Sequence, residues 1–178
     1  MKHMLYPTLI ILLSIATIVP RHAAAQAAQA KDTIKLHTLK YAGEYGYGKD
    51  TNKGPVGRII VYPETDNIML FYLDLNNGAP AYNTGAIYGR VKIAGDTGTF
   101  TTNYSLQHKG NGCNLDLRFS KGKLNIKTVP GKDGCGFGQG VAADGEYKRY
   151  KNEVPDSFTD RAGKKIYFKN APPDVYTR

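Results

Sequence analysis

The sequence predicts an all-β fold: a small antiparallel β-barrel or sandwich of about seven to nine strands, with little helix. Three observations support this prediction. Apolar and polar residues alternate along most of the chain, and turn residues interrupt the alternation at intervals of roughly 10–15 residues. The composition fits as well, because the 178 residues include 20 Gly and 13 Tyr but no Trp. In residues 26–178, no stretch longer than about ten residues carries the apolar period of a helix.

The clearest alternation lies between Cys113 and Ser120, where every odd-numbered residue is apolar and every even-numbered residue is polar. Lys121-Gly122 then supplies a turn, and the alternation resumes over residues 123–127. These segments predict a hairpin with one face in the core. A second hairpin is predicted between residues 87–93 and 99–102, which are separated by the turn residues Gly-Asp-Thr-Gly.

Two further strands are predicted upstream, Arg58 to Tyr62 and Ile68 to Leu75, and the weaker candidates are Leu36 to Tyr47 and Lys165 to Lys169. The segment from Ile68 to Leu75 is apolar on both faces for most of its length. Such a strand is either central in a sheet or covered on its outer face by a terminal segment. An outer-membrane barrel is the rival architecture, but its strands should run about 9–11 residues with an apolar side facing lipid. Most of the strands predicted here are shorter, and their outer faces carry Lys, Arg, Asp and Asn.

The first 25 residues are predicted to be a Sec-type signal peptide. Lys2 and His3 form a short basic region, a mainly apolar run follows from Leu5 to Val19, and Ala23-Ala24-Ala25 offers an A-x-A cleavage site. Cleavage up to about five residues further along is the alternative. No Cys near this site could accept a lipid. We therefore expect a periplasmic or secreted protein that is not a lipoprotein and does not span the membrane.

The mature chain, residues 26–178, is predicted to be a single basic domain whose C-terminal segment, 152–178, is a terminal strand or a tail. It has 22 basic and 15 acidic side chains, which gives a net charge of +7. A positive domain is attracted to anionic surfaces. Because an exported protein seldom meets nucleic acid, the expected partner is an envelope protein, an anionic glycan or a lipid headgroup.

Cys113 and Cys135 are the two cysteines, and an even count in an exported chain predicts a disulfide. A redox dithiol would usually show C-x-x-C spacing. A metal site would need more ligands than two thiols and the histidines His37 and His108, which lie in separate polar stretches. The sequence therefore predicts neither a metal nor a cofactor.

The C-terminal third carries three motifs: C-x-L-x-L-x-F at residues 113–119, GCGFG at 134–138 and V-x-A-D-G-x-Y at 141–147. Together they resemble a module of small exported bacterial proteins of uncharacterised function, some of which are similar to periplasmic lysozyme inhibitors. The resemblance makes inhibition of a protein one expected activity. The short inhibitory motif of those inhibitors is absent, so no inhibitory residue is carried over. The positive charge also opposes binding to a strongly cationic lysozyme.

Phe137 lies in a glycine-rich loop that has both a structural and a functional interpretation. Gly136 and Gly138 permit positive φ or a close approach of the backbone, and Phe137 is expected to plug one end of the core. In the structural interpretation, the loop is a corner of the fold held by the disulfide. In the functional interpretation, its N–H groups form a cradle for an anion, although the common phosphate-loop motifs are absent.

Basic residues concentrate near the C-terminus, and five residues there are candidate binding residues: Lys148, Arg149, Lys164, Lys165 and Tyr167. A solvated strand face explains them without any ligand. Because aromatic residues are interleaved with the basic ones, they could instead form a surface that contacts anionic groups and stacks on rings.

The sequence favours a binding protein over an enzyme, because neither histidine of the mature chain lies in a nucleophile motif and the sequence does not bring any pair of carboxylates together. We expect an exported soluble module of the cell envelope that engages an anionic glycan or headgroup, or binds and inhibits a protein. The alternative is a structural or accessory envelope protein that docks onto a larger complex through residues 152–178. A hydrolase is the third interpretation.

Overall fold

The computed structural model describes residues 37–102 and 112–174, all of which belong to one structural unit of the chain. The predicted signal peptide, residues 1–25, and His108 lie outside the described residues.

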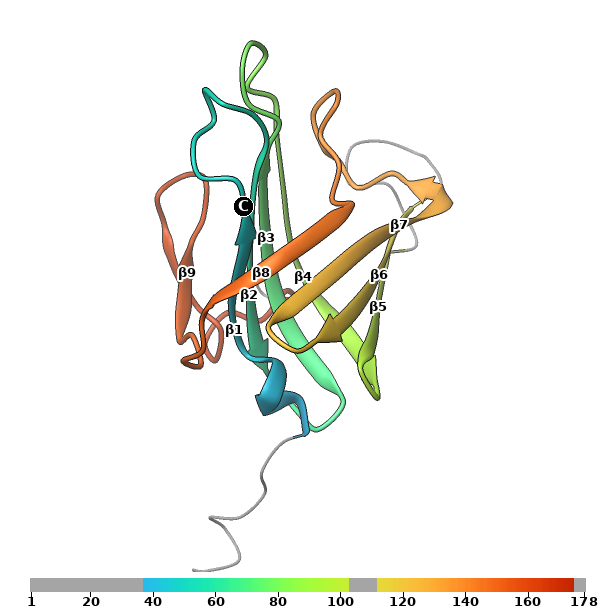
Figure 1. Ribbon diagram of the computed structural model, residues 1–178. Helices are drawn as coiled ribbons and strands as arrows, with labels where there is room; N and C mark the ends of the chain where they lie inside the picture. Colours follow the sequence, from blue (N-terminus) through green and yellow to red (C-terminus); the bar gives the residue numbers. More distant parts are fainter. Residues whose placement is uncertain (1–36, 103–111, 175–178) are drawn as a thin grey trace, which may run out of the picture. The chain divides into compact units, whose positions relative to one another are not determined.

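Eight strands form a closed antiparallel barrel in which each strand pairs with its neighbours in the chain and β8 pairs with β1 (Figure 1). The strands are β1 (Gly43–Tyr47), β2 (Val56–Pro63), β3 (Ile68–Asn76), β4 (Thr84–Ala94), β5 (Thr97–Thr101), β6 (Cys113–Ser120), β7 (Lys123–Asp133) and β8 (Gly145–Lys151). The predicted all-β class is confirmed, and the barrel is the correct choice between barrel and sandwich. Both predicted hairpins are present, as β4–β5 and β6–β7.

Side chains fill the interior of this barrel. Along β3, for example, Met69, Phe71, Leu73 and Leu75 alternate inward and are fully buried. The same alternation on the other strands adds large rings from β1, β6 and β8: Tyr45, Phe119 and Tyr147. Eight-stranded barrels either fill their interior with side chains or hold one small ligand there, and the continuous core cluster places this barrel in the filled group.

A short 3-10 helix, η2 (His37–Tyr41), closes one end of the barrel. The Tyr41 ring stacks on Phe119 with 4.4 Å between ring centroids, and its hydroxyl donates to the Gly95 carbonyl at 2.7 Å. Thr38 is completely buried and donates its hydroxyl to the Thr65 carbonyl. The strand predicted from Leu36 to Tyr47 is therefore too long, because its first part turns under the barrel and the strand begins at Gly43.

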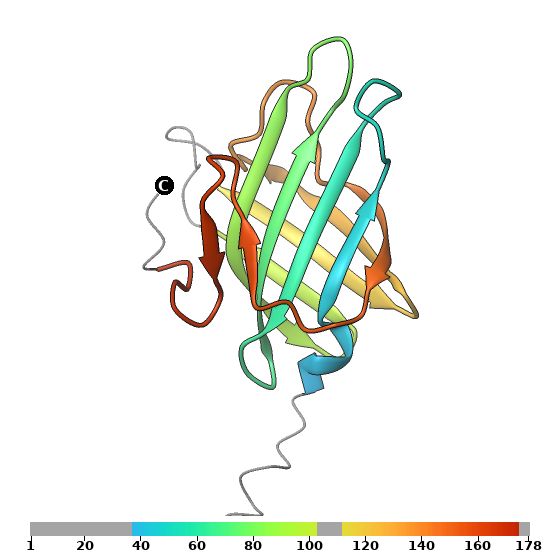
Figure 2. The same ribbon diagram turned by 90° about the vertical axis from the view of Figure 1, so that its left-hand side faces the viewer.

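The C-terminal segment forms a separate two-stranded sheet of β9 (Ser157–Thr159) and β10 (Lys165–Tyr167), which lies on the outer face of β2–β4 (Figure 2). Phe158 stacks on Tyr72 with 4.1 Å between ring centroids, and Phe168 stacks on Tyr62 at 5.1 Å. This cover explains why the segment from Ile68 to Leu75 is apolar on both faces. The predicted terminal strand exists, but its partner is β9 and not the barrel.

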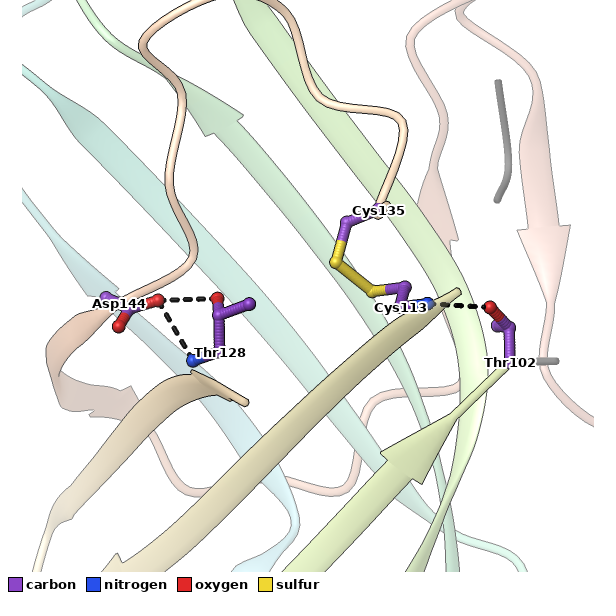
Figure 3. Close-up of a disulfide and its surroundings, with 5 residues drawn as sticks. All are labelled: Thr102, Cys113, Thr128, Cys135 and Asp144. Carbon is purple, nitrogen blue, oxygen red and sulfur yellow. Dashed lines mark hydrogen bonds between the residues drawn. A yellow bond between two sulfur atoms is a disulfide. The ribbon is translucent and has the colours of Figure 1, made fainter. Parts of the chain in front are cut away.

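The predicted disulfide joins Cys113 at the start of β6 to Cys135 in the loop after β7 (Figure 3). The Cys113 N–H donates to the Thr102 hydroxyl at 3.1 Å, which ties this corner to the end of β5. The β6–β7 ladder is irregular here, because its register shifts between Cys113 and Leu115. The disulfide thus fixes an irregular part of the barrel rim.

Candidate functional site

The glycine-rich loop between β7 and β8 lies at the barrel end opposite η2, which we call the loop end (Figure 1). Phe137 is half-buried and packs against the core, where its ring fills the space that a side chain at Gly85 would occupy. The Gly138 N–H donates to the Thr84 carbonyl at 2.9 Å. The neighbouring N–H groups of Cys135 and Val141 also donate to backbone carbonyls. This bonding supports the structural interpretation of the loop over an anion cradle.

Arg149 lies at the η2 end, where it packs against a tyrosine and is partly buried. Its guanidinium carbon is 4.8 Å from the centre of the Tyr45 ring. One of its nitrogens donates to the Lys40 carbonyl at 2.8 Å and to the Tyr45 hydroxyl. Burial raises the pKa of Tyr45, and the hydrogen bond from Arg149 partly opposes this effect. Arg149 therefore closes the barrel between β1, β8 and η2.

Lys164, Lys165 and Tyr167 lie on the C-terminal hairpin, so they belong to a different element from Lys148 and Arg149. All three are exposed, and the Lys165 ammonium is 5.0 Å from the centre of the Tyr167 ring. They face away from the apolar contact between the hairpin and the barrel. In the turn beside them, Arg161 donates to the Asp74 carboxylate of β3 at 2.7 Å.

Lys148 borders a groove of about 810 Å³ on the outer face of β8, β1 and β2, which we call the basic groove. Its lining consists of three cations, two tyrosines, a valine and three glycines: Lys49, Arg58, Lys148, Tyr47, Tyr150, Val56, Gly46, Gly48 and Gly57. Lys49 and Lys148 are exposed and form no ion pair with the described part of the chain. Arg58 is 3.8 Å from Asp74. The groove thus holds more positive charge than its neighbours neutralise.

Strand register places these cations in one row across the sheet. Lys123 of β7 lies opposite Lys148 of β8, Lys148 lies opposite Gly46 of β1, and Gly46 lies opposite Arg58 of β2. Like charges directly opposite each other in an antiparallel pair are destabilising. Lys123 is neutralised by Glu146 at 2.9 Å. Lys148 has no such neighbour among the described residues, so its charge is available to a bound anion.

A β-bulge lies beside the groove and brings Lys151 onto the outer face together with Tyr150. The β1–β8 register changes from Glu44↔Lys151 to Tyr45↔Arg149, which makes Tyr150 the extra residue. As a result, Tyr150 and Lys151 both reach the outer face, where the Glu44 carboxylate accepts hydrogen bonds from both side chains at 2.9 and 2.6 Å. The Tyr150 ring lies over Gly46, where an added Cβ would be 3.2 Å from the ring. Bulges often re-aim a side chain beside a functional site.

Tyr150 keeps its proton and adds no negative charge to the basic groove at neutral pH. Partial burial, followed by the hydrogen bond to the Glu44 carboxylate, raises the pKa of Tyr150 to about 12. More than half of the side chain remains exposed. The groove therefore offers a neutral ring between positively charged side chains.

Sequence reasoning identified Lys148 but did not include Lys49, Arg58 and Tyr150 among the site residues. Alternation along β8 places Lys148 and Tyr150 on the same face. Residues 46–58 and 148–150 lie side by side only because β8 pairs with β1 and closes the barrel. No local pattern in the sequence predicts that pairing.

A second hollow, of about 460 Å³, opens at the loop end between Tyr47, Asn77, Val141 and Asp144. Two carboxylates line it and both are already engaged. Asp144 accepts hydrogen bonds from the Thr128 N–H and hydroxyl at 3.0 and 2.6 Å (Figure 3), and Glu146 is paired with Lys123 at 2.9 Å. In the described residues, no group of three or more His, Cys, Asp or Glu side chains is placed to hold a metal.

Comparisons with protein-family models, curated proteins and solved structures find no match for this chain. Among the described residues, none forms a helix that is long and apolar enough to cross a membrane. The site must therefore be interpreted from its own geometry.

Proposed function

We propose that this domain is an exported binding module of the cell envelope that holds an acidic polysaccharide in the basic groove. The observation that carries the proposal is the combination of Lys49, Arg58 and Lys148 around the exposed ring of Tyr150. Cations attract carboxylate or sulfate groups, and the flat face of the ring can pack against the C–H face of a sugar.

The packed barrel supports an outer surface as the binding site. Rings and aliphatic side chains fill the interior, which leaves the surface as the place for a ligand. The C-terminal hairpin turns its apolar residues Phe158, Ile166 and Phe168 toward the barrel. This arrangement favours the groove over residues 152–178 as the docking surface, and so favours a binding module over an accessory protein that docks through its tail.

A polysaccharide fits the groove better than a membrane surface does. A protein that binds lipid headgroups through its surface usually inserts apolar side chains beside its cations. The exposed large apolar or aromatic residues among those described are Leu39, Tyr82, Tyr150, Val154 and Tyr167, and of these only Tyr150 lines the groove. The groove therefore presents cations and the exposed ring of Tyr150, while its other apolar lining residues, Tyr47 and Val56, are only partly exposed.

The test is a titration of the mature, oxidised domain with polygalacturonate, with neutral dextran and anionic lipid vesicles as comparison ligands. We expect saturable binding to polygalacturonate alone. Lys148→Gln should weaken it by roughly threefold, and Arg58→Gln with Lys148→Gln by roughly tenfold, the size expected for exposed ion pairs.

The matched control is Lys127→Gln, which removes the same charge from an exposed position on β7. If this control weakens binding as much as Lys148→Gln, the net charge of the domain is the attraction and the groove is not a site. If the domain binds the vesicles more tightly than polygalacturonate, the ligand is a lipid headgroup and not a polysaccharide.

A further inference from the structure

We infer that the ligand is a linear polyanion that crosses the strands, contacting Lys123, Lys148 and Arg58 in turn, and not a single anionic group. This inference rests on the proposed function and specifies the ligand of the same site. The geometry behind it is the row of residues that faces outward from β7, β8, β1 and β2.

The row is too long for one carboxylate or sulfate. Neighbouring strands lie about 4.8 Å apart, so three strand spacings separate Lys123 from Arg58 by about 14 Å along the surface. A single anion can contact one or two of these cations. A chain with a charge on successive units can contact all of them at once.

The middle of the row has a floor that a chain can lie on. Gly46 contributes no side chain between Lys148 and Arg58, and the Tyr150 ring covers it. Glu44 fixes this ring by accepting its hydroxyl hydrogen bond at 2.9 Å. A sugar unit at this point would rest on the ring while its acidic groups reach the cations on either side.

At each end of the row, a carboxylate forms an ion pair with the cation and holds its side chain in place. At one end, Lys123 is 2.9 Å from Glu146. At the other end, Asp74 follows Arg58 in the register and contacts both Arg58 and Arg161. The negative charge of Asp74 is therefore compensated by two arginines, so it does not repel a polyanion that reaches Arg58.

The experiment measures the affinity of the domain for galacturonate oligomers of increasing length, from the monomer to an octamer, at two salt concentrations. We expect affinity to rise steeply with length until the oligomer spans the row and then to level off. Lys123→Gln should weaken the octamer by about threefold and leave the dimer unchanged, because only the longer chain reaches β7. Lys127→Gln, on the same strand but off the row, should change neither.

The outcomes separate this inference from the proposed function. If Lys148→Gln weakens binding while Lys123→Gln behaves like Lys127→Gln, the groove holds a short acidic ligand and the crossing polyanion is wrong. If none of the variants differs from Lys127→Gln, both proposals are wrong.

Inorganic polyphosphate tests whether the ligand must contain sugar rings, because it is a linear polyanion without them. Tyr150→Ala should weaken the octamer by about threefold more than it weakens polyphosphate, since only the sugar packs on the ring. If Tyr150→Ala weakens the binding of the octamer and of polyphosphate equally, or if polyphosphate binds more tightly than the octamer, the ligand is not an acidic polysaccharide.

Discussion

Gly85 and Phe137 show how one absent side chain makes room for another. A Cβ at Gly85 would lie 2.3 Å from Phe137 Cδ1, a distance that real Cβ contacts do not show. Phe137 in turn packs against the core at the loop end. The effect of a substitution at Gly85 on β4 therefore depends on whether the Phe137 ring of the β7–β8 loop is present.

We predict strong coupling between these two positions. Gly85→Ala should lower the free energy of unfolding by about 1–3 kcal/mol through overpacking, and Phe137→Ala by about 2–3 kcal/mol because the ring is half-buried. The double variant should lose less than the sum of the two single losses, since the added methyl then meets only the Cβ of residue 137, at 3.0 Å, and no ring. Urea unfolding of the four proteins measures this cycle. Additive losses would show that Phe137 does not occupy this place.

The tyrosines near the β1–β8 pair predict loss of stability in alkali. The pKa of Tyr150 rises from an ordinary value of 10.0 to about 12, and burial also raises the pKa of Tyr147. Between pH 10 and pH 12, the Tyr150 hydroxyl has lost its proton in the unfolded chain but keeps it in the folded chain. The folded state then binds more protons, so the free energy of unfolding falls as pH rises from about 10 to 12.

Urea unfolding at several pH values in this window measures the slope. Tyr150→Phe should flatten it, because phenylalanine has no proton to release. Tyr167→Phe, at an exposed position on the hairpin, is the control. A slope that is the same in wild type and Tyr150→Phe would contradict the assignment to Tyr150.

At the residue scale, the disulfide was predictable because the chain offers one pairing of two cysteines. The contacts that partly bury Arg149 could not be predicted. Alternation in β8 places Arg149 on the same face as Tyr147, which is inward. Whether an inward arginine reaches solvent depends on what closes that end of the barrel, and η2, which supplies the Lys40 carbonyl, lies over 100 positions earlier in the chain.

The C-terminal hairpin stabilises the barrel as an outer cover on β2–β4. Phe158, Ile166 and Phe168 are almost completely buried against Ile60, Leu70 and Tyr72. Two further contacts fix the segment beyond the hairpin, because the Tyr88 hydroxyl donates to the Ala171 carbonyl at 2.9 Å and Arg90 contacts Asp174. Removing this element would expose an apolar patch on the barrel.

We predict that Phe158→Ala lowers the free energy of unfolding by about 2–4 kcal/mol, because the ring is buried between Tyr72 and Tyr88. Tyr167→Ala, on the exposed side of the same hairpin, should change it by less than about 0.5 kcal/mol. Thermal unfolding measures both. Equal effects would mean that the hairpin does not pack on the barrel as described.

At the element scale, the sequence predicted the need for this cover but not its source. The two apolar faces of the segment from Ile68 to Leu75 indicated either a central strand or a covered one. The segment from Lys165 to Lys169 was a candidate strand, while Ser157–Thr159 is only three residues long and carries too little alternation to be recognised. Short strands that depend on packing for their stability leave a weak local pattern.

At the scale of the whole molecule, barrel closure produces the basic groove. Residues 46–58 and 148–150 come together because the last barrel strand pairs with the first. The sequence predicted the all-β class from alternation, but closure depends on the number, tilt and stagger of the strands together. For the same reason, the row from Lys123 to Arg58 follows from the register and could not be predicted from charge alone.

Removing the disulfide should weaken the fold without weakening ligand binding. Cys113 and Cys135 are 22 positions apart, and closing a loop of this length is worth roughly 3 kcal/mol in the chain-entropy model. We therefore expect Cys113→Ala with Cys135→Ala to lower the free energy of unfolding by about that amount. Where the protein remains folded, its affinity for polygalacturonate should be unchanged, because the disulfide joins β6 to the β7–β8 loop and the groove is built on β8, β1 and β2. Urea unfolding and a polygalacturonate titration of the same sample separate the two effects, and a loss of affinity in the folded variant would show that the loop end, not the groove alone, supports binding.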